Sequence, residues 1–374
     1  MPMATESEDE LREVVPRATL DPSSLAAFVD PLSIPEIARL DELRIDPSNS
    51  AQRIPYYRIA MREVLVKLHR DLPPTRLWGY GGTSPGPTIE TQSGHPLMVE
   101  WVNELPKAHL LAIDHHIHGA EASKPNVRAV VHLHGAKVKP DSDGYPEDWY
   151  VPGKSRLSYY PNGQDAAMLW YHDNALGITR LNVYAGLFGA YFIRDSAEGA
   201  LNLPAGKCEV PLILCDRKVD STGQLYYQTS PMFNAPWLPE FYGNLILANG
   251  KLLPYLDVEP RRYRLRVVNV SNSRFLTLSL SNHMMFQQIG SDQGLLREPV
   301  NVATVILAPA ERADLVVDFA SHRGAQIVLN DESGPIMQFR VDGGIGATSA
   351  AVPATLRRST SSSSRRSATR SSGP

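Results

Sequence analysis

Two short stretches of the chain combine residues that can bind a metal ion. VVHLHG (130–135) carries His132 and His134 two positions apart, and LWYHDN (169–174) carries His172 and Asn174 at the same spacing. Because side chains alternate along a strand, each pair lies on one face with about 6–7 Å between its members. Imidazoles without thiolates or clustered carboxylates suit copper, zinc or iron. One such pair is as readily explained by surface histidines, but two pairs together favour a metal site.

The other histidines and the two cysteines have simpler explanations. HHIHG (115–119) lies in a loop-like stretch before the first pair, and we interpret it as a connecting segment rather than a metal site. Cys208 and Cys215 are separated by an odd offset in CEVPLILC, which places them on opposite faces of one strand. They cannot pair with each other there, so we expect two buried free thiols.

The elements that position these residues are predicted to be strands. Thirty prolines and 26 glycines divide the chain into short segments rich in Val, Leu, Ile, Thr and Tyr. YRLRVVNV (263–270) alternates, with Tyr263, Leu265 and Val267 on one face and two arginines on the other. Long stretches with a helical period are scarce. The sequence therefore predicts an all-β chain of sandwich or barrel type.

Composition divides the chain into five segments. We expect an extended N-terminal arm (1–55), a first β domain (56–195), a linker (196–207), a second β domain (208–343) and a Ser/Arg-rich tail (344–374). The tail contains no aromatic and no acidic residue, so it cannot bury enough apolar surface to offset the cost of ordering. It is predicted to be disordered.

Charge and hydropathy exclude several classes of partner. The net charge is -3, so no basic field draws the chain to nucleic acid or to an anionic membrane. No apolar run approaches the ~20 residues that a membrane span needs. The acidic start MPMATESEDELREVV does not resemble a signal peptide, which predicts a cytoplasmic location.

The metal-binding stretches also carry a family resemblance. VVHLHGAKVKPDSDGYPEDWY (130–150) and LWYHDNALGITRLNVYAGLFGAYFIRD (169–195) resemble the first domain of multicopper oxidases, in the branch of bilirubin oxidase, spore-coat laccase and phenoxazinone synthase. LHRDLPPTRLWGYGGTSPGPTIE (68–90) and LANGKLLPYLDVEPRRYRLRVVNVSNSR (247–274) extend the likeness to roughly residues 25–343. The resemblance also makes the spore coat, or another cell-associated site, an alternative location.

The resemblance implies tandem cupredoxin-like Greek-key domains and copper cofactors. Family members use four coppers: a type 1 copper takes single electrons from substrate, and a trinuclear cluster reduces O₂ to water. By the resemblance, His132 corresponds to a type 2 ligand, and His134 and His172 to type 3 ligands. Asp143 resembles an acid that assists proton delivery, although a turn aspartate before Gly144 explains it equally well.

The sequence departs from the family pattern in its copper ligands. Asn174 stands where the family has histidine, and an amide oxygen is a weak donor for copper. The HPxHxH and HCHxxxH motifs of the family's third domain do not occur in the sequence. We therefore expect at most one bound copper in this chain.

The expected function is a laccase-like oxidation of phenolic, aminophenol or tetrapyrrole substrates with O₂, in an impaired form. One alternative is a non-catalytic two-domain cupredoxin remnant, and another is a product whose partner segment is encoded separately. Surfaces that relatives cover with a third domain are expected to lie open and to favour self-association.

Overall fold

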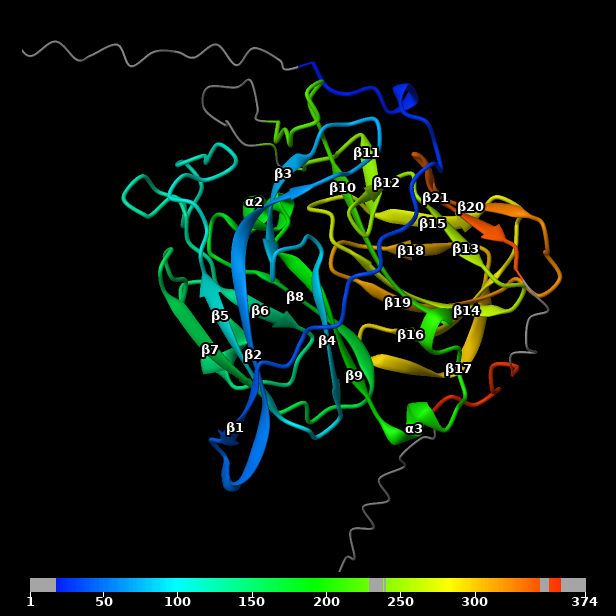
Figure 1. The fold of residues 1–374 in the computed structure, drawn as a ribbon, viewed down its shortest axis with the longest axis horizontal. Coiled ribbons are helices and arrows are strands. Elements are labelled where there is room, and N and C mark those ends of the chain that lie inside the picture. The colour runs from blue at the N-terminus through cyan, green and yellow to red at the C-terminus, as the bar shows by residue number, and fades with distance from the viewer. Residues whose placement is uncertain (1–17, 229–237, 239, 344–349, 358–374) are drawn as a thin grey trace, which may run out of the picture.

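The computed structural model describes residues 18–228, 238, 240–343 and 350–357, and most of its regular elements are strands (Figure 1). The longest helix in this range, α2 (Thr179–Ala185), has seven residues. Within the described residues, no helix combines the length and the apolar character needed to cross a membrane. The all-β prediction is confirmed.

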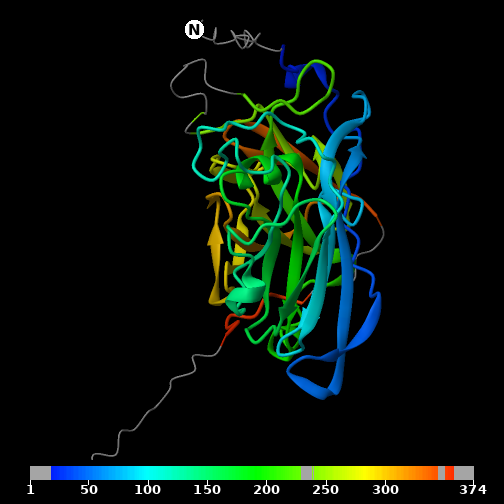
Figure 2. The ribbon, with the colours of Figure 1, turned by 90° about the vertical axis from the view of Figure 1, so that its left-hand side faces the viewer.

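The first half of the molecule is a sandwich of two sheets. One sheet has the order β1-β2-β5-β7 with β3 paired to β2, and the other has the order β4-β9-β8-β6. Apolar side chains from both sheets, including Trp78, Trp101 and Tyr171, form the core between them. In Figure 2 the long blue strand β2 runs along one edge of the molecule. The strands are β1 (Glu42–Asp46), β2 (Asn49–Val66), β3 (Thr75–Tyr80), β4 (Gly86–Gln92), β5 (Leu97–Asn103), β6 (Val131–His134), β7 (Ser155–Tyr160), β8 (Ala167–Asp173) and β9 (Phe188–Arg194).

The second half repeats this plan with a larger sheet. Its sheets have the orders β12-β11-β10-β14-β19-β16-β17 and β13-β21-β20-β15-β18, and side chains from both enclose a separate core. The strands are β10 (Glu209–Arg217), β11 (Leu245–Ala248), β12 (Lys251–Leu252), β13 (Tyr255–Val258), β14 (Arg262–Asn269), β15 (Leu276–Leu280), β16 (Phe286–Ser291), β17 (Gly294–Val302), β18 (Val305–Leu307), β19 (Arg312–Asp318), β20 (Gln326–Asp331) and β21 (Gly334–Val341).

The two faces of β14 carry different side chains, and both faces are buried. Tyr263, Leu265 and Val267 are buried in the core of the second half, as the period of two predicts. Arg264 and Arg266 point the other way, yet only 3% and 2% of their surfaces are exposed. Charged side chains are buried to this degree only when they are paired.

The partners of these arginines form an ion-pair network where the halves meet. Arg264 pairs with Asp314 of β19 at 2.5 Å and with Glu198 at 2.6 Å, in the short helix α3 (Ser196–Gly199) that connects the halves. Arg266 pairs with Glu209 of β10 at 2.9 Å. Glu209 also pairs with Arg194 of β9, at 2.7 Å, so the network ties the first half to the second.

The N-terminal segment lies across both halves. Leu25 and Leu32 are buried, and strands begin at Glu42 in β1, earlier than the boundary predicted at Tyr56. Residues 1–17 of the predicted arm lie outside the described residues. The arm's backbone forms three bridges to the two halves: Thr19 with Asp220, Pro31 with Tyr255, and Ile37 with Thr88.

Part of the segment predicted to be disordered is packed against the second half. Leu356 is buried beside Ile289 and Val316, and its backbone nitrogen donates to the carbonyl of Arg297 at 2.9 Å. Residues 350–357 contain a few apolar side chains that can be buried. The composition of the whole tail, averaged over its many polar residues, did not indicate this. The rest of the predicted tail, residues 344–349 and 358–374, lies outside the described residues.

We predict that Asp314→Ala destabilises the protein. Burial would raise the pKa of Asp314, but Arg264 and Arg266 outweigh it and hold the pKa below its usual value. Removing this carboxylate leaves a buried guanidinium without its nearest partner, which costs about 3–5 kcal/mol. Urea unfolding at pH 7 measures the decrease in free energy of unfolding. Asp257→Ala is the control, because Asp257 is exposed.

The same carboxylate gives the loss a pH dependence. Because its folded-state pKa is lowered, its contribution is present above the unfolded pKa and disappears as the pH falls through the folded value. The difference in free energy of unfolding between wild type and Asp314→Ala should therefore decrease below about pH 4. A difference in unfolding free energy that stays constant until the protein unfolds in acid would contradict the prediction.

Candidate metal centre

The first histidine pair lies on the edge strand of the smaller sheet in the first half. β6 pairs antiparallel with β8, and the register sets His132 opposite His172 and His134 opposite Trp170. The intervening Leu133 points into the core and is 1% exposed. The alternation therefore turns both histidines to the same side, where the strand partner adds a third imidazole.

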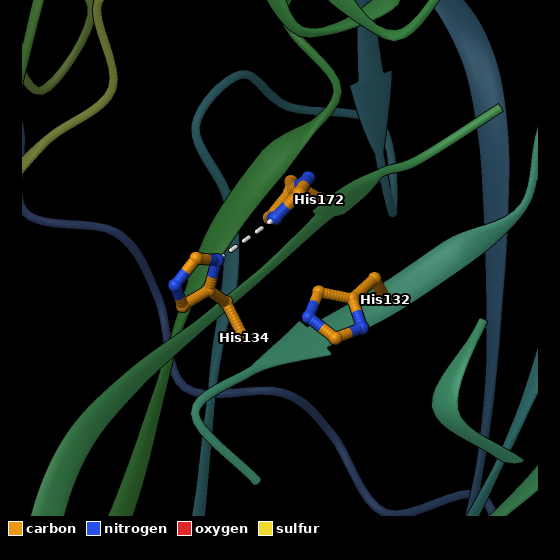
Figure 3. Close-up of side chains that lie close together, drawn as sticks. All are labelled: His132, His134 and His172. Atoms are coloured by element: carbon orange, nitrogen blue, oxygen red, sulfur yellow. Dashed lines mark hydrogen bonds between the residues drawn. The ribbon is translucent and has the colours of Figure 1, made fainter. Parts of the chain in front are cut away.

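The three imidazoles converge on one point. One ring nitrogen from each of His132, His134 and His172 lies within 4.8 Å of those of the other two. Figure 3 shows the rings turned toward one another, with Nδ1 of His134 3.4 Å from Nε2 of His172. Among the described residues this is the one group of three such donors held so close together. The prediction that these three side chains meet is confirmed as geometry.

Hydrogen bonds fix the tautomers of two of the rings. Nδ1 of His132 lies 2.6 Å from the carbonyl oxygen of Asp143, and Nδ1 of His172 lies 2.7 Å from the carbonyl oxygen of Asp173. A carbonyl can only accept, so each Nδ1 carries the proton and each Nε2 keeps its lone pair. Metal-binding histidines are typically held by this kind of contact.

Burial keeps two of the three rings uncharged at neutral pH. Burial lowers the pKa of His172 to about 3, and the neighbouring His132 adds to the shift. Burial also lowers the pKa of His134 to about 4, with Arg312 adding to it. Both rings are therefore neutral imidazoles at pH 7, the form that binds metal ions.

Trp170 holds two of the three rings by stacking. Its indole lies 4.1 Å from the His172 ring at 27° and 5.4 Å from the His134 ring at 25°, measured between ring centroids. From the sequence alone, Trp170 is most simply interpreted as a packing aromatic. Its position two residues before His172 on the same strand face is the signal that could have identified it.

Asn174 does not join the cluster. β8 ends at Asp173, and the side-chain nitrogen of Asn174 donates to the carbonyl of Gly144 at 3.0 Å. Its backbone nitrogen donates to the carbonyl of Val130 at 2.8 Å. The expected strand geometry therefore stops one residue short of Asn174, and its amide secures a loop instead.

That loop also positions Asp143. Asp143 ends the short helix α1 (Pro140–Asp143), and Gly144 follows with φ of 78°. A Cβ at Gly144 would lie 2.1 Å from the carbonyl oxygen of Val131, so only glycine permits this approach to β6. The Asp143 carboxylate lies 3.4 Å from Nδ1 of His132. Asp143 is thus both a turn residue and a neighbour of the cluster, while its role in proton delivery stays a prediction.

The other candidates lie elsewhere. Cys208 and Cys215 are buried free thiols, as predicted. In the loop 115–119, His116 and His118 are exposed, with 76% and 89% of their side-chain surfaces accessible. Neither belongs to the three-histidine cluster.

A cavity of about 600 Å³ opens beside the cluster, between the two halves. His134, His172 and Trp170 line it from the first half, and Phe241 and Pro309 line it from the second. Its walls are mostly apolar. Self-association through this face stays a prediction.

Comparisons with known proteins show which family the chain is similar to. Sequence models described as "Multicopper oxidase" match residues 65–128 and 125–198, and residues 223–333. A laccase of Bacillus subtilis (strain 168) is 46% identical over 345 residues, covering 85% of this chain and 66% of that protein. A laccase of Bacillus stratosphericus is 44% identical, with the same coverage of 85% and 66%. The chain thus spans about two thirds of the length of these relatives.

Solved structures show the same fold. The crystal structure of a laccase from Pediococcus acidilactici superposes with a TM-score of 0.73 at 28% identity, covering 89% of this chain and 66% of that one. The McoA multicopper oxidase of Aquifex aeolicus gives a TM-score of 0.70 at 26% identity, covering 88% of this chain and 68% of that one. The predicted cupredoxin-like fold is confirmed.

We predict that Trp170→Leu weakens copper binding about 10–100-fold, the usual effect of removing a group that orients metal ligands. The three imidazoles remain, but two of them lose the stacked surface that fixes their ring planes. Competition titration of Cu²⁺ against a chelator measures the dissociation constant. Trp149→Leu is the matched control, because Trp149 lies near Arg128 and outside the cluster. Equal affinities in all three proteins would contradict the positioning role.

Proposed function

Since the chain belongs to the multicopper oxidase family, we propose that its three-histidine cluster binds copper in a laccase-like oxidase. The proposed substrates are small phenolic, aminophenol or tetrapyrrole molecules, and O₂ is the electron acceptor. The observation that carries the proposal is the convergence of three imidazole donors within 4.8 Å. Imidazole is a ligand that suits copper.

The donor set fits copper well. His132 and His172 each present Nε2 with its proton held on Nδ1. Nδ1 of His134 donates to Nε2 of His172 and would present its lone pair once a metal ion takes the place of that proton. By position, His132 is proposed as a type 2 ligand, and His134 and His172 as type 3 ligands. Copper bound there supplies one-electron chemistry and a site for O₂.

In this proposal the surrounding residues orient the histidine ligands and transfer protons. The Asp143 carbonyl and the Asp173 carbonyl keep protons on the far nitrogens of two ligands, so the near nitrogens stay free to bind. Trp170 fixes two ring planes by stacking on them. The Asp143 carboxylate, 42% exposed and beside His132, is placed to pass protons between solvent and the cluster.

Asn174 supports a second candidate function. The amide is held by Gly144 and contributes no imidazole nitrogen, so the described residues offer three histidine ligands. Three ligands serve one copper and do not serve an adjacent pair. The alternative function is therefore a non-catalytic protein that retains one copper ion.

We predict that residues 1–374 retain one copper per chain after incubation with excess Cu²⁺ and desalting. His134→Ala combined with His172→Ala should lose that copper, because one imidazole remains, whereas His95→Ala, an exposed histidine elsewhere, should keep it. Atomic absorption measures the stoichiometry. No intense blue absorption is expected, because that colour needs a thiolate ligand and neither buried cysteine belongs to the group of three histidines. Four coppers per chain would refute this assignment.

Phenol oxidation separates the two candidate functions. Sustained O₂ consumption above that of an equal concentration of free Cu²⁺, lost in the double histidine variant, supports the oxidase. A rate equal to that of free copper supports the copper-retaining alternative.

We further predict that Asn174→His raises copper affinity without raising phenol oxidation by this chain. The change adds a fourth imidazole two residues after His172, just beyond the end of β8, but provides no thiolate site for electron entry. Asn174→Gln is the control that keeps the amide. A blue, phenol-oxidising Asn174→His protein would contradict this expectation.

A further inference from the structure

The loop from Asp114 to Glu121 lies at the edge of the cavity that reaches the three histidines. It belongs to the turn-rich segment between β5 and β6, drawn in cyan in Figure 1. Ile117 and His118 line the same cavity as His134 and His172. The cavity therefore connects a histidine-rich stretch of surface with the cluster.

The histidines of this loop are anchored in the same way as the cluster ligands. Nδ1 of His115 lies 2.8 Å from the carbonyl of Ala120, and Nδ1 of His116 lies 2.9 Å from a carboxylate oxygen of Asp114. Nδ1 of His118 lies 3.4 Å from Glu121. An imidazole whose Nδ1–H is held by a carbonyl or carboxylate presents a more basic Nε2 to a metal ion.

Two of these imidazoles are open to solvent. The side chains of His116 and His118 are 76% and 89% exposed, and their Nε2 atoms have no hydrogen bond to any described residue. Both carry an acidic partner, so negative charge lies behind each outward nitrogen. This arrangement attracts cations to the loop.

Asp114 adds a buried carboxylate beside the exposed histidines of the loop. Its side chain is only 6% exposed, and one carboxylate oxygen accepts from the backbone nitrogen and ring of His116. The other oxygen is buried and has no hydrogen-bond partner among the described residues. The negative charge of this carboxylate, held behind the His116 ring, favours a cation at the outward Nε2 of that ring.

We propose that His116 and His118 form a surface copper-capture site that loads the three-histidine cluster through the shared cavity. The delivery step rests on the proposed copper function of that cluster. The loop does not hold three donors as closely as the cluster does, so it binds copper weakly and releases it. His118, which lines the cavity, is the group that passes the ion inward.

Binding at the loop is tested on the full chain with Cu²⁺ as the probe. Titration followed by electron paramagnetic resonance should resolve a tight site and a weaker second site with nitrogen hyperfine coupling. His116→Ala with His118→Ala should abolish the second site and keep the first. His95→Ala with His283→Asn, which changes two exposed histidines elsewhere, should keep both. An unchanged second site in the loop variant overturns the proposal.

Delivery is tested by the rate at which the cluster fills. Trp170 stacks on His172, so its fluorescence is quenched when Cu²⁺ binds there, and stopped-flow mixing at substoichiometric copper follows the loading. The loop variant should load about tenfold more slowly, because it loses a local supply of ions, and should reach the same final quenching. An unchanged loading rate overturns the delivery role.

The two proposals fail in different ways. The His134→Ala, His172→Ala protein should still show the weak site, because the loop is intact. If the wild-type chain shows only the weak site, the proposed function of the cluster fails and the delivery step fails with it. If the wild-type chain shows only the tight site, the capture proposal fails alone.

Discussion

The register between β6 and β8 is the constraint on which the candidate metal centre depends. Opposite pairing of His132 with His172 brings imidazoles from two strands together, and the pleat sends Leu133 and Tyr171 to the core on the other side. A slip by one residue would exchange these faces and place apolar side chains at the cluster. The core of the first half therefore fixes the ligand geometry, because the same strands cannot satisfy the core in another register.

The sequence predicted the strand faces at this site but could not predict where the strand would end. The alternation places His132 and His134 on one face of their strand, as their spacing predicts. Their convergence with His172 depends on the pairing of β6 with β8, which only the family resemblance indicated. Asn174 has the right spacing, but β8 stops at Asp173 and the chain turns toward Val130 and Gly144. That turn depends on contacts between segments distant in sequence, which local periodicity does not contain.

The sequence also could not predict which polar strand faces are buried against another part of the molecule. Arg264 and Arg266 have the pattern of an outward face, but that face meets the other half of the molecule and carries an ion-pair network. Trp170 was interpreted as a packing residue because its contact with the ligand His172 is visible only in the structure. Leu356 lies in a stretch whose composition predicts disorder, and its burial depends on a surface formed by β16 and β19. In each case the missing information was the identity of the neighbouring element.

The path of the N-terminal arm has a consequence for the order of assembly. Residues 19 and 31 pair with partners in the second half, and residue 37 pairs with β4 in the first. During synthesis the arm leaves the ribosome long before Asp220 and Tyr255 exist, so its docking surface is incomplete while the first sandwich forms. Contacts so far apart in sequence close slowly. Residues 19–37 are therefore among the last to reach their native positions, and Leu25 and Leu32 stay exposed to other molecules until they do.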